Sequence, residues 1–199
     1  MKRRRFLNKN RKYSTLMNNS SGKSRRRNRI IIEILLYAVE LAVVVGLAYF
    51  IIHYGLVKTT MVGDSMNTTL SNGDEVLINK LIYRVASPAR NDVVAYSINS
   101  EHSNLAIKRI IGLPGERILI KEGAVYINNN KLEEDIEVEP MKTGGLAEEE
   151  IKLEDNEYFL LGDNRNNSED SRFSEIGTIV KKDIIGKVWI KMDNYSFIK

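Results

Sequence analysis

Cysteine is absent from this chain of 199 residues, and histidine is nearly absent, because only His53 and His102 occur. The lack of cysteine excludes structural disulfides, thiolate metal sites and a cysteine nucleophile. Two histidines leave few candidates for the base of a Ser-His-Asp triad, and they exclude a histidine-rich metal site. We therefore expect no metal and no cofactor.

Acidic side chains are missing from residues 1–29, which carry twelve Lys or Arg. The other 170 residues hold 18 basic and 26 acidic side chains, which is a formal charge of −8. Because it has few apolar residues, the basic tail is expected to stay without ordered structure. It is either a cytoplasmic segment that sets membrane topology or an arm that binds nucleic acid or anionic lipid. The segment that follows favours the first interpretation.

A long apolar run follows the tail, over residues 30–52. As a helix at about 1.5 Å per residue, it is long enough to cross the ~30 Å hydrocarbon core of a bilayer. It is also longer than the apolar core of a secretory signal, and no small-residue cleavage site follows it. We predict a single-pass helix with its interface over residues 30–54, the tail being cytoplasmic and residues 55–199 extracytoplasmic.

The rest of the chain has no long run with the 3.6-residue apolar period of a helix. Short β-rich runs alternate with Asn, Gly and Pro turn signals, which predicts a mostly β domain of several short antiparallel strands over residues 55–199. The pair Glu122-Gly123 predicts a hairpin. The acidic stretch 129–156 is interpreted as a solvent-facing insertion. The predicted strands are 74–79, 92–98, 105–111, 117–121, 124–128, 158–161 and 184–191.

Ser65 stands in a turn-prone stretch soon after the apolar run, two residues after Gly63. A serine hydroxyl is a weak nucleophile that needs a base to accept its proton. His53 is expected at the membrane boundary and His102 in a loop. Position 67 is Asn, so the Gly-x-Ser-x-Gly elbow is absent. A hydrolase with a histidine base is therefore poorly supported.

Lysine is the alternative base, and Lys108 lies within the apolar strand predicted over 105–111. Burial disfavours the charged ammonium and lowers its pKa, so a buried Lys108 could accept a proton from a serine. Arg109 presents the same problem on the opposite face of the strand. Alternation alone leaves open which of the two side chains is buried.

The polar stretch 162–172 follows an apolar strand and carries Ser168, Asp170 and Arg172 at alternate positions. In an extended conformation these three side chains would share a face. Ser168 could then orient a neutral lysine, while an Asp170–Arg172 pair holds the segment in place. The alternative is an ordinary surface turn that satisfies its own hydrogen bonds.

These residues stand in four ordered blocks that together resemble the type I signal peptidases, in the short form of Gram-positive bacteria. The blocks are 63–66 with 69–70, then 90–94, 108–116 and 162–172. The resemblance implies a membrane-anchored serine endopeptidase with a Ser-Lys dyad, which removes N-terminal signal peptides from exported preproteins. Secretory preproteins and membrane lipid are then the expected partners, and nucleic acid is not.

The resemblance also implies a role for each matching position. Ser65 is the expected nucleophile, with its backbone N–H in the oxyanion hole, and Lys108 is the general base positioned by Ser168. The further expected site residues are Asp170 and Arg172 as a supporting pair, Asp163 and Arg165 at other motif positions, and Gly63, Asp64 and Met66 around the pocket and the oxyanion.

Two positions depart from the family pattern, because Thr68 stands where proline is usual and Asn91 where glycine is usual. Both positions shape the backbone, so the departures bear on the turns near the nucleophile. Two other functions stay open beside the resemblance. One is a Ser-Lys protease that cleaves itself or a regulator, as in the repressor-cleaving fold, and the other is an anchored non-enzymatic scaffold that binds through its basic tail.

Overall fold

The protein is described from a computed structural model that covers residues 2–97 and 105–198, with side chains from residue 26 onward. Two compact units are distinguished, Met1–Ile52 and His53–Lys199, and each is described by itself. His102, one of the two candidate histidine bases, lies outside the described residues.

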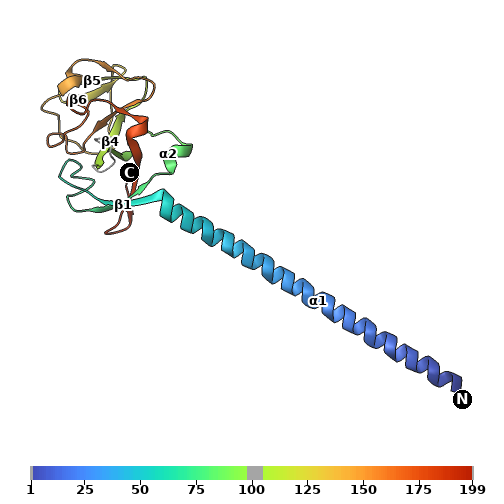
Figure 1. The fold of residues 1–199 in the computed structure, drawn as a ribbon. Coiled ribbons are helices and arrows are strands. Elements are labelled where there is room, and N and C mark those ends of the chain that lie inside the picture. The colour runs from blue at the N-terminus through green and yellow to red at the C-terminus, as the bar shows by residue number, and fades with distance from the viewer. Residues whose placement is uncertain (1, 98–104, 199) are drawn as a thin grey trace. The chain divides into compact units, whose positions relative to one another are not determined.

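The first unit is a single helix, α1, which runs from Lys2 to Phe50 and is followed by a π-helical turn over Ile51–Gly55 (Figure 1). Its segment Arg26–Gly55 has a mean hydropathy of 2.5 and is long and apolar enough to cross a membrane, by length and composition. The helix predicted over 30–52 is therefore confirmed. The expectation that residues 1–29 lack ordered structure was wrong, because Lys, Arg, Leu and Met are strong helix formers and no proline interrupts them.

The second unit consists of two antiparallel sheets, which confirms the prediction of a mostly β fold. The larger sheet has the order β1-β2-β11-β3-β4-β9-β10, with β12 paired to β11, and the smaller has the order β7-β6-β5-β8. The strands are β1 Leu56–Thr60, β2 Glu75–Asn79, β3 Val93–Ser97, β4 Leu105–Gly112, β5 Arg117–Lys121, β6 Ala124–Ile127, β7 Asn130–Lys131, β8 Ile151–Lys152, β9 Glu157–Leu161, β10 Ile179–Val180, β11 Ile184–Lys191 and β12 Ser196–Phe197. Three short helical turns complete it, α2 Ile82–Val85, η2 Gly145–Glu148 and η3 Lys181–Asp183.

All seven predicted strands are present, as β2, β3, β4, β5, β6, β9 and β11. The turn at Glu122-Gly123 joins β5 and β6 as an antiparallel hairpin, as predicted. Four of the strands that were not predicted have only two residues each, which is too short to produce an apolar pattern. In the fifth, β1, half-buried and exposed side chains alternate only weakly, because the strand lies at the edge of the larger sheet.

Strand β4 is covered on both of its faces. It lies between β3 and β9 in the sheet. Ile107 packs in one apolar cluster, Ile110 in a second and Ile111 in a third. Lys108 and Arg109 are therefore buried together, with 6% and 2% of their surface exposed. The question that alternation left open is answered, since both side chains are buried.

Residues 129–156 were interpreted as a solvent-facing insertion, and the structure corrects this interpretation in part. Their carboxylates are mostly exposed. However, Met141, Ala147 and Leu153 are buried in the apolar cluster that also contains Ile118 and Phe159. The interpretation was wrong for these three residues, because apolar side chains spaced singly among acidic ones still pack against the smaller sheet.

The two positions that depart from the family pattern both have positive φ. Asn91 has φ 69°, a left-handed conformation that glycine and asparagine adopt most readily. Its backbone N–H donates to Ile110 O at 2.9 Å, so asparagine supports the turn that glycine usually makes. Thr68 has φ 117°, whereas proline is restricted to φ near −65°, so proline is incompatible with this backbone conformation.

Substitution of Asn91 tests the conformational explanation. Asn91→Val is expected to lower the free energy of unfolding by about 1–2 kcal/mol, because a β-branched side chain is disfavoured in left-handed backbone, which asparagine tolerates. Asn91→Gly loses the same side-chain contact with Asp135 but keeps the favoured conformation, so it is the matched control. Urea unfolding of the full chain in detergent, followed by the fluorescence of the single Trp, measures the difference. Equal stability of the two variants would contradict the explanation.

Candidate active site

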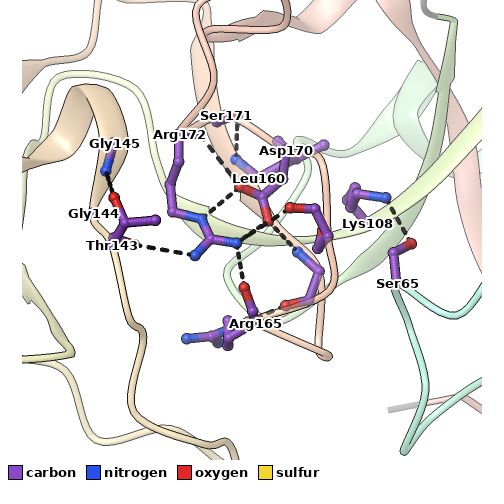
Figure 2. A network of polar contacts seen from close by, with 12 residues as sticks. Ser65, Lys108, Thr143, Gly144, Gly145, Leu160, Arg165, Asp170, Ser171 and Arg172 are labelled. Carbon is purple, nitrogen blue, oxygen red and sulfur yellow. Dashed lines mark hydrogen bonds and ion pairs between the residues drawn. The ribbon is translucent and has the colours of Figure 1, made fainter.

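A serine and a lysine that are 43 residues apart in the chain meet in the second unit. Lys108 Nζ donates a hydrogen bond to Ser65 Oγ at 2.8 Å (Figure 2). Ser65 is half-buried, whereas Lys108 is buried within β4. The distance is that of a nucleophile and its base within direct proton-transfer reach.

The loop that carries Ser65 is held from both sides. Gly63 has φ 83°, and its backbone N–H donates to Asn72 Oδ1 at 3.0 Å. Asn164 N donates to Ser65 O at 3.0 Å, and Asn164 Nδ2 donates to Asp64 O at 3.1 Å. These contacts orient the peptide groups around Ser65. The sequence analysis assigned Asn164 no role of its own.

The three pocket positions predicted around Ser65 have different surroundings. Gly63 and Asp64 are exposed beside the serine. Met66 is completely buried in the apolar cluster that contains Ile107. Met66 therefore has no exposed surface in the described structure, and its predicted contribution to a pocket stays a prediction.

Burial is the main influence on the pKa of Lys108. It lowers the pKa of the Lys108 ammonium below that of an exposed lysine, because the charged form loses its hydration. Three carboxylates act in the opposite direction on this pKa with smaller effects, and they belong to Asp170, Glu169 and Asp163. Among the described residues none forms an ion pair with Lys108. The neutral amine that a general base requires is thus favoured by burial.

Arg109, next to Lys108 on the opposite face of β4, is paired with a carboxylate. Its Nε and Nη2 donate to Asp163 Oδ1 and Oδ2 at 2.8 and 2.7 Å. Thr69 Oγ1 accepts from Arg109 Nη2 at 3.1 Å and donates to Asp163. The pair joins β4 to two loops of the site. The sequence analysis assigned Arg109 no role, although a charged side chain inside an apolar strand was the signal that could have identified it.

The loop 162–172 is closed by a second buried ion pair. Arg172 Nε and Nη2 donate to Asp170 Oδ1 and Oδ2 at 2.8 and 2.9 Å (Figure 2). Asp170 Oδ2 also accepts from Gly162 N at 3.1 Å, and Arg172 Nη2 donates to Arg165 O at 2.6 Å. The Asp170–Arg172 pair expected from the sequence is present, but it forms within a folded loop rather than across an extended face.

Several contacts connect this loop to residues 129–156, and two of them involve its arginines. Arg165 Nη1 donates to Glu134 Oε1 at 2.7 Å, while Arg165 Nε donates to Gly162 O at 3.0 Å. Arg172 Nη1 donates to Thr143 O at 3.3 Å. The insertion therefore contributes partners to the site, and the sequence analysis missed both Glu134 and Thr143. Nothing in the sequence distinguishes Glu134 from its exposed acidic neighbours.

Ser168 lies against Gly162 but makes no hydrogen bond to Lys108 in the described structure. Its hydroxyl is buried, and no described group is its hydrogen-bond partner. A Cβ on Gly162 would come within 2.5 Å of Ser65 O and 2.6 Å of Ser168 Cβ. The missing side chain of Gly162 thus lets the serine loop and Ser168 approach each other. The orienting role of Ser168 stays a prediction.

No group of three or more His, Asp or Glu side chains that could hold a metal ion is found within residues 26–97 and 105–198.

Comparisons with known proteins place the chain in a family. A family model described as signal peptidase, peptidase S26, matches residues 34–192. Signal peptidase I S of Bacillus subtilis is 34% identical over 162 residues, which cover 77% of this chain and 86% of that protein. A probable signal peptidase I-2 of Synechocystis is 35% identical over 133 residues, which cover 64% of this chain and 58% of that protein.

A solved structure of signal peptidase I from Enterococcus faecalis aligns with a TM-score of 0.41 and 25% identity, covering 52% of this chain and 98% of that chain. Family membership rests on the sequence matches. Together with the N-terminal apolar helix they define a membrane-anchored hydrolase of the peptidase class. The chain belongs to the signal peptidase family, peptidase S26, in which the Ser-Lys dyad is general.

The buried Asp170–Arg172 pair yields a stability prediction. Asp170→Asn keeps the shape of the side chain but leaves the Arg172 guanidinium buried without a carboxylate, so it is expected to lower the free energy of unfolding by about 3–5 kcal/mol. Glu150→Gln is the control, because it breaks the exposed Arg117–Glu150 pair and should change stability little. Urea unfolding measures both variants, and similar losses would show that the buried pair has no special role.

Proposed function

We propose that Ser65 and Lys108 form the catalytic dyad of a signal peptidase that cleaves the signal peptides of exported preproteins. The observation that carries the proposal is the 2.8 Å contact between Lys108 Nζ and Ser65 Oγ, made by a buried lysine whose pKa is lowered by burial. Ser65 Oγ attacks the scissile carbonyl while the neutral amine of Lys108 accepts the hydroxyl proton.

The proton then moves to the departing group. Lys108 gives it to the nitrogen of the scissile bond, the C–N bond breaks, and an ester between Ser65 and the signal peptide remains. A water molecule, deprotonated by Lys108, hydrolyses this ester and regenerates the hydroxyl. The Ser65 backbone N–H contributes to the oxyanion hole, and its orientation is supported by the Asn164–Ser65 hydrogen bond.

The remaining motif residues act as supports in this proposal. Ser168 orients the Lys108 amine, and its buried hydroxyl is free of other described hydrogen bonds. The pair Asp170–Arg172 and the residues Asp163 and Arg165 hold the loops around the dyad.

The substrate strand is proposed to add to β4. Residues Leu105–Lys108 pair with β3 on one side, whereas β9 pairs on the other side only from Arg109 onward within the described chain. The second edge of Leu105–Lys108 is therefore available to an extended backbone that ends at Ser65. Main-chain hydrogen bonds would then bind the substrate independently of its sequence.

The topology belongs to the same proposal. The helix spans the membrane once, residues 1–29 are cytoplasmic, and the second unit is extracytoplasmic, since basic segments stay inside. Preproteins and lipid are the proposed partners, without nucleic acid. The family match begins at residue 34, so the basic tail lies outside it, and the alternative of a scaffold that acts through its tail is not favoured.

Substitution of either dyad residue tests the mechanism. Ser65→Ala and Lys108→Ala are each expected to abolish cleavage of a preprotein by the purified full chain in detergent. Lys108→Arg should also be inactive, because a guanidinium does not lose its proton. Product formation on gels measures activity, and the urea midpoint of each variant shows that it is folded. Cleavage at the wild-type rate by any of them would refute the dyad.

The pH dependence of cleavage follows from the lowered pKa of Lys108. The base acts only when neutral, so kcat/KM is expected to rise with pH and to reach half its maximum below the pKa of an exposed lysine. Glu169→Gln removes an exposed negative charge that raises this pKa, so its profile should shift to lower pH. Glu150 does not contribute to the pKa shift of Lys108, so Glu150→Gln should leave the profile unchanged. A flat profile between pH 5 and 9 would contradict a lysine base.

A further inference from the structure

A cavity of about 770 Å³ lies next to the loop that follows Ser65. Its walls are formed by residues 67–69, 136–140 and 163–165. The volume is within the range of ligand-binding sites, which is about 300–1,000 Å³. None of the proposed catalytic steps uses this cavity.

The cavity lies beside Ser65. Asn164, which lines it, donates to Ser65 O at 3.0 Å and to Asp64 O at 3.1 Å, and the lining residues 67–69 follow Ser65 closely in the chain. From Arg109 onward β9 occupies the second edge of β4. A substrate strand on Leu105–Lys108 would therefore leave the sheet after Ser65, close to residues 67–69 of the cavity wall.

The three segments that line the cavity differ in their charged side chains. Asp163 and Arg165 are buried and already paired, with Arg109 and Glu134 respectively. The exposed carboxylates of the lining belong to Glu137 and Glu139. Glu139 Oε2 accepts a hydrogen bond from the neutral amide of Asn166 at 3.3 Å, and neither carboxylate is in an ion pair among the described residues. The unpaired charge of the lining is therefore negative.

The same wall also offers apolar contacts. Ile136 and Val138 are half-buried and alternate with Glu137 and Glu139, as in an extended segment with one face toward the protein. Thr68, with its unusual φ of 117°, also lines the cavity. An extended peptide thus finds both apolar surface and negative charge within one cavity.

We propose that this cavity binds the first residues of the mature protein, those after the scissile bond, and that it favours basic over acidic side chains there. The inference rests on the proposed function, because it requires a peptide cleaved at Ser65. The selectivity comes from Glu137 and Glu139, which attract Lys or Arg and repel Asp or Glu. It should weaken as salt is added, since exposed charges are screened.

The test compares two preproteins that differ only in carrying Lys or Glu at the second to fourth positions after the scissile bond. The purified full chain in detergent is expected to cleave the Lys substrate with the higher kcat/KM, by about 2- to 5-fold per charge pair, as for partly exposed ion pairs. The double variant Glu137→Gln/Glu139→Gln should bring the ratio close to one. Glu133→Gln/Glu154→Gln removes the same charge outside the lining and should keep the wild-type ratio.

The outcomes separate the two proposals. If the wild type cleaves both substrates and the Gln double variant keeps the wild-type ratio, the cavity proposal is wrong and the peptidase proposal stands. If the wild type cleaves neither substrate, the peptidase proposal fails and the inference fails with it. Binding of fluorescent Lys and Glu peptides to Ser65→Ala, with and without the double substitution, measures the same preference without turnover. Equal affinities in the presence of Glu137 and Glu139 would overturn it.

Discussion

The burial of two consecutive basic residues on β4 is the constraint on which the site depends. Alternation along a strand directs Lys108 and Arg109 to opposite faces, and both faces are covered. The two side chains differ in how the loss of hydration on burial is compensated. The guanidinium of Arg109 is paired with Asp163 in two hydrogen bonds, whereas burial lowers the pKa of the Lys108 amine. One strand thus provides both a structural ion pair and the proposed base.

The loop 162–172 brings an acidic residue, Asp170, near Lys108 and pairs it with an arginine. Asp170 is completely buried, and its charge favours protonated Lys108. Arg172 binds both carboxylate oxygens of Asp170 and, with Arg165, connects the loop to Thr143 and Glu134 of the insertion. Burial nevertheless has a larger effect on the pKa of Lys108 than the charge of Asp170. The insertion therefore supports the loop from outside, although its own surface is mostly polar.

Much of the fold could be predicted because its local signals agree. The strands β2 to β6 are bounded by turn residues such as Gly73, Pro114 and Gly123, and their apolar residues recur with the period of a strand. The two-residue strands β7, β8, β10 and β12 could not be predicted, since they exist only where another strand supplies hydrogen bonds. The helix over the basic tail was missed because the prediction relied on how few apolar residues the tail could bury. The helix propensity of its residues was given too little weight.

The sequence by itself determined the apolar helix and the β class, because each depends on residue type and local spacing. Its four motif blocks, through their resemblance to the type I signal peptidases, also identified Ser65 and Lys108 as the candidate pair. Only the tertiary structure decided that Lys108 and Arg109 are both buried, since alternation specifies a face but not what covers it. It also decided the partner of Arg165, because Glu134 is 31 residues away in the chain. The cavity beside Ser65 is likewise formed by three segments that meet only in the folded domain.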